Sequence, residues 1–147
     1  MPTPTRIAGY ASVFDVPDSG GDVVRRGAFA RAVVAAAAAG AGDVPVPLLW
    51  QHDAAHPIGR VDHLSEDSRG LRVIASLSDT RVARDAAALL ASKALTGLSF
   101  GYRVRASVPA GGARHLTDLE LIEVSLVTFP MQRLARVVAV SPQETIA

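Results

Sequence analysis

The sequence predicts an α+β fold: a small, mainly antiparallel β-barrel or curled sheet flanked by about two helices. Three observations lead to this prediction. Short apolar or alternating runs recur along the chain, with clusters of turn-forming residues between them. Two segments rich in alanine have the composition and spacing of helices. The connections between these segments are mostly short, and the sequence contains no internal repeat.

Six or seven segments are expected to form strands, the seventh being residues 136–140. Residues 7–14 (IAGYASVF) mix aromatic and β-branched residues and precede a dense cluster of turn formers at 15–22, which predicts a strand and then a long loop. The further expected strands are residues 46–51, 58–64, 71–77, 98–108, 116–129 and 136–140. The segment PAGG at 109–112 is typical of a hairpin connection between two of them.

Two helices are expected. Residues 28–39 (AFARAVVAAAAA) are strong helix formers in sum, and Gly40 follows them as a stop signal. Residues 81–93 (RVARDAAALLASK) place apolar side chains at helical spacing. Asp79 and Thr80 stand just before this second segment and are candidate N-caps.

The composition limits the classes of function. The 147 residues, 49% of them hydrophobic, are expected to form one domain with a core from about 7 to 136 and short polar termini. Lys plus Arg number 15 against 14 Asp plus Glu, and no basic segment is interleaved with aromatics, so nucleic acid is not an expected partner. The absence of cysteine excludes disulfide scaffolds, thiolate nucleophiles and cysteine-ligated zinc.

Nothing in the sequence suggests a membrane segment. The longest apolar run, residues 32–41, is mostly alanine and falls short of the roughly 20 residues that span a bilayer. Residues 1–6 lack the charged start and apolar stretch of a secretory signal. Both observations predict a cytoplasmic protein.

Two of the four histidines, His52 and His56, stand four residues apart in the segment HDAAH. This pattern differs by one methylene from the HExxH motif of zinc proteases, in which a helix places both rings on one face. A helix is not expected here, because Pro57 disfavours the α region for His56 and the preceding VPVPLLW has an extended character. A zinc hydrolase using His52 and His56 stays as an alternative.

Ser99 lies between Gly97 and Gly101 in the segment TGLSFGY. In a strand these three positions face the same side, which would leave room above and below the serine for a substrate backbone. The alternative is a barrel corner in which the serine is incidental. A serine hydroxyl becomes a good nucleophile only beside a base. His52, at the end of an apolar strand, is the candidate base; otherwise it is an ordinary surface histidine.

Glu123 is a carboxylate inside the apolar run LIEVSLVTFP. Burying it without a partner would be costly, so a histidine or an arginine is expected beside it. If Glu123 faces His52, it can orient the ring and stabilise the imidazolium, as the third member of a catalytic triad does. The alternative is a structural ion pair with Arg103 or Arg105 on the adjacent strand.

Five segments occur in a fixed order from about Ile7 to about Arg136. They are GYASVFD with the following GDVVRRGAFA, PLLWQHDAAHPIGRV, GLRVIASL, ALTGLSFGYRV and LELIEVSLVTFP. Together they resemble the prohead (procapsid) maturation serine proteases of tailed bacteriophages, of the Hong Kong phage type. The resemblance implies a serine endopeptidase with a herpesvirus-assemblin-like fold, a β-barrel surrounded by helices, and neither a cofactor nor a metal.

The resemblance also assigns site residues. The family histidine matches His52 in WQHD, and the family serine matches Ser99 in GLSFGY. The carboxylate of the segment LxEVSxVTxP matches Glu123, with Asp118 and Glu120 as possible substitutes.

A role inside the immature capsid, in the host bacterial cytoplasm, follows from the same resemblance. Such enzymes cut the scaffold, or the scaffold-like N-terminal region of the major capsid protein, and usually themselves. The implied partners are the major capsid protein with its scaffold region, and a second copy of the chain, because herpesvirus enzymes are activated by dimerisation. The alternative is a non-catalytic capsid or tail assembly protein, since phage tail tubes use a related barrel.

Overall fold

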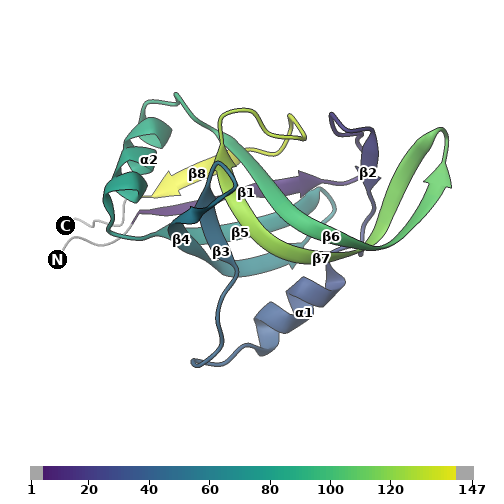
Figure 1. The fold of residues 1–147 in the computed structure, drawn as a ribbon, viewed down its shortest axis with the longest axis horizontal. Coiled ribbons are helices and arrows are strands. Elements are labelled where there is room, and N and C mark those ends of the chain that lie inside the picture. The colour runs from purple at the N-terminus through teal and green to yellow at the C-terminus, as the bar shows by residue number, and fades with distance from the viewer. Residues whose placement is uncertain (1–4, 142–147) are drawn as a thin grey trace.

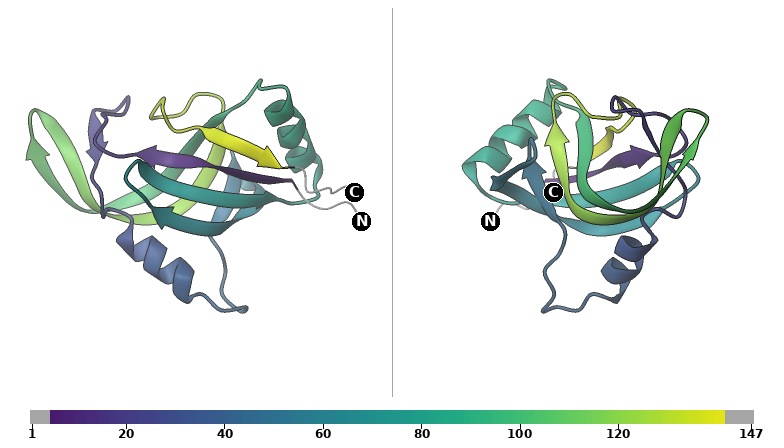
Figure 2. Two further views of the ribbon diagram at one scale, coloured as in Figure 1. Left: turned by 180° about the vertical axis from the view of Figure 1, so that it is seen from behind. Right: turned by 45° about the vertical axis from the view of Figure 1, so that its right-hand side comes forward.

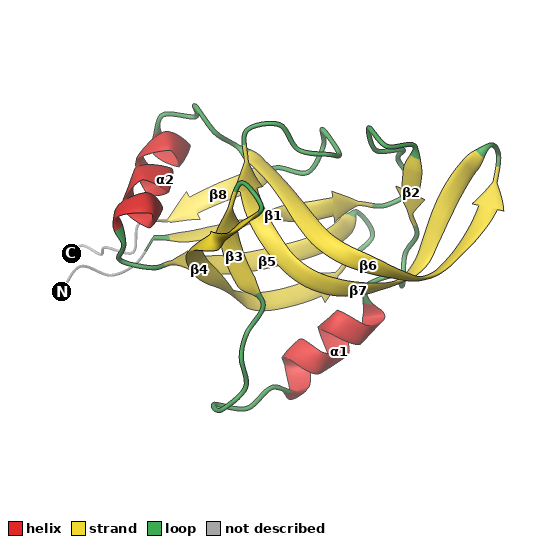
Figure 3. Ribbon diagram, viewed as in Figure 1, coloured by secondary structure: helices red, strands yellow, loops and turns green. Residues whose placement is uncertain are grey.

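The computed structural model describes residues 5–141, which contain eight strands and two helices (Figure 1). In chain order they are β1 (Arg6–Val13), β2 (Asp22–Val24), α1 (Ala30–Ala38), β3 (Pro47–Trp50), β4 (Asp53–Glu66), β5 (Gly70–Leu77), α2 (Arg81–Ala91), β6 (Gly97–Ala110), β7 (Ala113–Val127) and β8 (Val137–Ser141). Strands make up most of the fold, as the colouring in Figure 3 shows. Neither helix is long and apolar enough to cross a membrane.

The seven expected strands and both expected helices are confirmed, with shifts at their ends. The largest shift concerns the strand expected at 58–64, which is the middle of the longer β4. Strand β2 was not predicted, because three residues are too few to show an alternation. It forms by pairing with β7, where Val23 lies opposite His115.

The strands form one sheet in the order β2-β7-β3-β4-β5-β1-β8, with β6 on the other edge of β7. Most neighbours are antiparallel, but β2 and β3 both run parallel to β7. The predicted mainly antiparallel pairing holds, although the two parallel pairs make the sheet mixed. The prediction of a barrel was wrong, because the sheet is not closed. The parallel pairs arise because the connection through α1 returns the chain to the same edge of β7, further along that strand.

The sheet stays open between β1 and β6. Residues 135–137 cross there with an isolated bridge between Gly97 and Arg136, and the Tyr10 amide donates to the Arg136 carbonyl at 3.1 Å. Past this bridge, a cavity lies between residues 11–13 of β1 and residues 98–102 of β6. This cavity contains the candidate site.

The core lies between the strands and is closed at one end by α2. Its fully buried side chains include Ile7, Leu48, Ile58, Leu71, Val73, Leu98, Leu116, Leu119 and Leu126. Helix α2 adds Ala83, Ala86 and Leu90, which recur every three or four residues on one face. Its predicted cap is confirmed, because the Thr80 hydroxyl accepts a hydrogen bond from the Ala83 amide at 3.2 Å.

A turn at residues 27–29 replaces the first residues of the predicted first helix. The two carboxylate oxygens of Glu66 accept hydrogen bonds from the Gly27 and Phe29 amides, at 2.8 and 2.9 Å. Phe29 is fully buried and its ring contacts that of Phe100, with 5.1 Å between centroids. Helix α1 has no buried residue of its own, so this turn anchors it to the sheet. Figure 2 shows α1 and α2 on different sides of the sheet.

Strands β6 and β7 form a long hairpin whose outer half extends away from the rest of the protein (Figures 1 and 2). The predicted connection is confirmed as a two-residue turn, in which Gly111 and Gly112 have φ of 60° and 81°. A turn of this type needs positive φ at both central residues, which glycine adopts without steric cost. The inner half of the hairpin carries Ser99 and Glu123.

Candidate active site

His52 lies in the tight turn between β3 and β4. Trp50 pairs with Asp53, which leaves Gln51 and His52 as the two central residues. Their φ values are 53° and 60°, in the left-handed region. For residues other than glycine this conformation costs about 1 kcal/mol or more, so contacts with the surrounding protein must stabilise the turn.

The contacts that hold this turn come from β7 and the residue after it. The Gln51 amide donates to the Leu126 carbonyl at 2.9 Å. The Gln51 side chain donates from Nε2 to Thr128 Oγ1 at 2.8 Å and accepts from the Thr128 amide at 3.1 Å. The turn that carries His52 is therefore fixed to the strand that carries Glu123.

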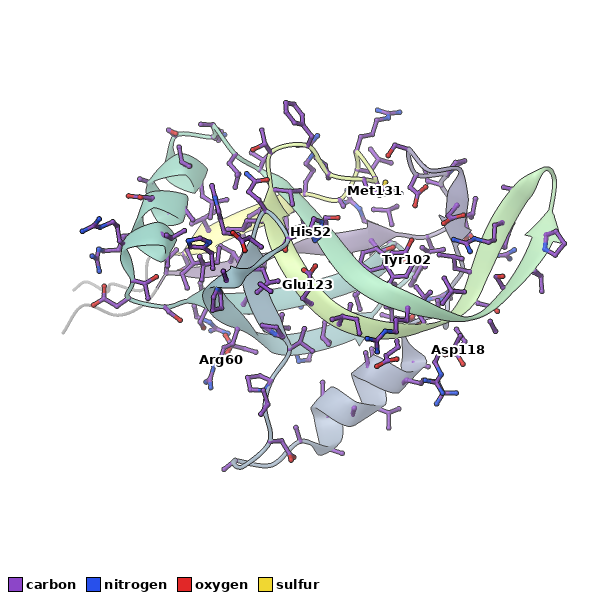
Figure 4. All side chains as sticks on the ribbon, in the orientation of Figure 1. His52, Arg60, Tyr102, Asp118, Glu123 and Met131 are labelled. Atoms are coloured by element: carbon purple, nitrogen blue, oxygen red, sulfur yellow. The ribbon has the colours of Figure 1, made fainter. Side chains whose placement is uncertain are left out.

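The His52 ring is paired with the Glu123 carboxylate. His52 Nδ1 lies 2.6 Å from Glu123 Oε2 (Figure 4). The Glu123 side chain is only 10% exposed, whereas the His52 side chain is 43% exposed. An ionised carboxylate only accepts hydrogen bonds, so Nδ1 donates and Nε2 of the neutral ring is free to act as a base.

Ser99 lies in β6 opposite Ser125 of β7, and the next pair along the same face is Gly101 with Glu123. A β-bulge between Gly101 and Tyr102 produces this register. Bulges re-aim side chains in this way near functional sites. The bulge therefore brings the serine and the carboxylate to the same part of the hairpin.

Ser99 and His52 line one cavity of about 500 Å³. Its walls are formed by β1, by the loop at 16–19, by β6 and by the loop at 129–132, and they are mostly apolar. Ser99 is 5% exposed, so its contact with solvent is through this cavity. Tyr102 also lines it, and burial, with Asp22 and Asp18 nearby, raises the pKa of its phenol. The arrangement combines a hydroxyl, a base oriented by a carboxylate, and space for a ligand side chain.

The glycines beside Ser99 have a different role from the predicted one. A Cβ on Gly97 would lie 2.5 Å from the Val127 carbonyl oxygen, and one on Gly101 would lie 2.5 Å from Glu123 Oε2. The space above and below Ser99 is therefore taken by the protein itself, and the expectation that it admits a substrate backbone was wrong. Gly101 instead makes room for the Glu123 carboxylate.

Gly101→Ala is expected to keep the fold but to lower any activity that depends on the pair of His52 and Glu123. The new methyl group would displace the Glu123 side chain and break its 2.6 Å contact with His52. Because the carboxylate is buried, the displacement is also expected to lower the melting temperature. A misplacement of about 1 Å at a catalytic group lowers rates by about 100-fold. The measurement is peptide hydrolysis alongside the melting temperature.

Gly42→Ala is the matched control, because nothing lies within 4 Å of a Cβ at that position. Equal activity of the two alanine variants would show that Glu123 does not need its observed position.

The two histidines of HDAAH do not share a face. His52 Nδ1 contacts Glu123, whereas His56 Nδ1 contacts Asp53 at 2.7 Å, and this hydrogen bond lowers the pKa of the Asp53 carboxyl. The segment is a turn and the start of β4, as the proline and the extended flank predicted. Within residues 5–141 no three potential ligands are grouped to hold a metal ion.

The other candidate carboxylates have partners elsewhere. Asp118 forms a double hydrogen bond with Arg31, which holds the pKa of Asp118 below its ordinary value. Glu120 lies 3.6 and 3.8 Å from the guanidinium groups of Arg103 and Arg105. Those two arginines thus pair with Glu120, and Glu123 is the carboxylate that contacts His52.

Sequence reasoning missed Ser125. Its Oγ donates to Glu123 Oε1 at 2.8 Å and accepts from the His52 amide at 3.1 Å. The signal was present, because residues 123 and 125 of a strand lie on the same face, and a serine two positions from a buried carboxylate can bond to it.

Comparisons with known proteins agree with the resemblance. The model of the Caudovirus prohead serine protease family matches residues 3–145. The prohead protease of Enterobacteria phage HK97 is 30% identical in an alignment of 145 residues that covers 94% of this chain and 61% of that protein. The chain therefore spans about three fifths of the length of this curated relative.

The fold is similar to that of a herpesvirus protease. The crystal structure of the KSHV protease in complex with a hexapeptide phosphonate inhibitor matches with a TM-score of 0.58 and 14% sequence identity, over 94% of this chain and 65% of that one. The predicted herpesvirus-protease-like fold is thus confirmed, apart from the closure of the barrel. With a family match over nearly its whole length, the chain belongs to the Caudovirus prohead serine protease family.

Proposed function

We propose that this chain is a serine endopeptidase that cleaves the scaffold, or the scaffold-like N-terminal region, of a major capsid protein during procapsid maturation, and that it also cleaves itself. Ser99 is the nucleophile, His52 the general base and Glu123 the residue that orients His52. The observation that carries the proposal is the 2.6 Å contact of His52 Nδ1 with Glu123, beside a cavity that Ser99 also lines. Family membership supports the same reaction class.

The reaction follows from the roles of these groups. Ser99 Oγ attacks the carbonyl carbon of a peptide bond while His52 Nε2 takes the hydroxyl proton, and Glu123 stabilises the imidazolium that forms. His52 then gives the proton to the leaving amine, and the C–N bond breaks. Water, with His52 again as base, hydrolyses the acyl enzyme and regenerates Ser99.

The negative oxygen of the tetrahedral intermediate needs hydrogen-bond donors. Each donor of this kind contributes about 3 kcal/mol in serine proteases. The loop at 130–136 is the proposed source of a backbone donor, because its first residues line the cavity that contains Ser99. The apolar walls of the cavity would hold a substrate side chain next to the cleaved bond.

The place of action proposed for this activity is the interior of the immature capsid. Cleavage there would release the scaffold segment and permit the shell to expand.

The test is co-expression of the chain with a major capsid protein from the same genome, followed by intact mass of the capsid subunit. The wild-type chain is expected to remove an N-terminal segment, and Ser99→Ala to leave the subunit whole. The mass of the product also gives the cleavage site. If the capsid mass is the same with both folded chains, the proposal fails and a non-catalytic assembly role takes its place.

A further inference from the structure

Ser125 is a fully buried polar residue at the centre of the candidate site. It lies in β7, with Ser99 of β6 opposite it on one side and Leu49 of β3 on the other. The strand of the nucleophile and the strand that leads to His52 therefore flank the same residue. No other position in the described chain pairs with both Ser99 and β3.

The Ser125 hydroxyl bonds to both members of the pair formed by His52 and Glu123. The hydroxyl donates a hydrogen bond to Glu123 Oε1 at 2.8 Å, while Oε2 of the same carboxylate faces His52 Nδ1. Its oxygen accepts from the His52 amide at 3.1 Å. The hydroxyl thus fixes which carboxylate oxygen faces the ring and also holds the backbone from which the ring projects.

Both hydrogen bonds satisfy groups that would otherwise lack a partner. Glu123 is 8% exposed, and a buried carboxylate oxygen without a donor carries a large desolvation penalty. The His52 amide lies in a left-handed turn, between the ladder positions of β3 and β4. A methyl group in place of the hydroxyl could fill the same space but could make neither bond.

We propose that Ser125 is a positioning residue for catalysis, a fourth member of the site that aligns the Glu123 carboxylate and the His52 turn for attack by Ser99. This inference rests on the proposed function, because it assigns Ser125 a role in the same reaction. Ser125 does not touch the substrate; it acts through Glu123 and His52. Its loss slows the chemical step and leaves substrate binding unchanged.

The test compares Ser125→Ala, Ser125→Thr and Ser125→Val with the wild type. Threonine keeps the hydroxyl, and valine has the same shape without it. Two rates are measured: labelling of Ser99 by a fluorophosphonate, followed by intact mass, and hydrolysis of a peptide that spans the cleavage site found by co-expression. The low-field NMR resonance of the His52 Nδ1 proton reports the pair directly.

Ser125→Ala and Ser125→Val are expected to lower kcat and the labelling rate by about 10- to 100-fold, with KM within about twofold of the wild type. Ser125→Thr is expected to recover most of the lost rate and the low-field proton resonance. The matched control is Ser76→Ala, which removes another hydrogen bond from a serine to a carboxylate, that of Asp62, at an exposed place outside the cavity. This control is expected to keep the wild-type rates.

The outcomes separate this inference from the proposed function. If Ser99→Ala is inactive while Ser125→Val matches Ser125→Thr in rate and in the His52 Nδ1 proton resonance, the positioning role of Ser125 is overturned. The proposed protease function is then still supported. If Ser99→Ala hydrolyses the peptide as fast as the wild type, the proposed function itself is overturned. Melting temperatures identify any variant that fails to fold, and the comparison of threonine with valine then decides without the alanine variant.

Discussion

Ser99→Ala is expected to abolish fluorophosphonate labelling and to lower peptide hydrolysis by about 10⁴-fold or more, the size of the loss when a serine protease loses its nucleophile. Labelling forms a bond from Ser99 Oγ to phosphorus and expels fluoride, with His52 taking the proton. Alanine has no oxygen to form that bond. The measurement is the mass added per chain, together with the rate of cleavage of the peptide.

The fold is not expected to change, because Ser99 makes no side-chain hydrogen bond among those found in the described residues and already lines a cavity. Ser107→Ala is the matched control, since Ser107 lies in the same strand but on the exposed outer half of the hairpin. If Ser99→Ala is labelled at another serine and hydrolyses the peptide at the full rate, that other serine is the nucleophile. Loss of labelling in both variants would indicate that either substitution disturbs the folding of the hairpin, and would not support a specific role for Ser99.

His52 and Ser99 could be predicted from the sequence because each has a local signal. His52 ends an apolar strand, and Ser99 lies in a β-rich segment between two glycines. The strands themselves follow from alternation and turn residues, which are also local. The resemblance to the phage proteases added the order of the segments.

The position of Glu123 against His52 depends on register, which the sequence does not show. The hairpin begins with Ala110 opposite Ala113, and an unbroken ladder would place Gly101 opposite Ile122. The bulge between Gly101 and Tyr102 moves the pairing by one residue, so that Gly101 faces Glu123. A shift of one residue exchanges the faces of a strand. The same limit explains why the glycines were misinterpreted, because what lies above them is set by β7.

The openness of the sheet also depends on contacts between distant segments. The crossover through α1 gives β2 and β3 a parallel pairing with β7, and the crossing chain at 135–137 occupies the place where β1 and β6 would join. Neither feature has a local pattern. Strand content could thus be predicted while closure could not.

Glu123→Gln is expected to lower kcat by about 10⁴-fold, as the equivalent change of a carboxylate to an amide does in a serine protease of another fold. The Ser125 hydroxyl donates to Oε1 in the wild type. In the variant the Ser125 hydroxyl would donate to the amide oxygen of the new glutamine side chain in the same way, so the NH₂ group of that side chain would face His52 Nδ1. The ring would then carry its proton on Nε2, the nitrogen that must accept the proton of Ser99. The fault is in the tautomer, so the fold and KM are expected to change little.

The measurement is kcat and KM on the cleavage-site peptide, with the NMR resonance of the His52 Nδ1 proton, which the variant is expected to lose. Glu120→Gln is the matched control, because Glu120 lies three residues away in β7 and pairs with Arg103 and Arg105. It changes the same charge without touching His52, so any effect of net charge on capsid binding appears in both variants. Equal rates for the two glutamine variants would show that Glu123 has no catalytic role and is only a structural partner of His52. A loss confined to Glu123→Gln would instead show that the carboxylate acts by holding the histidine in its reactive tautomer.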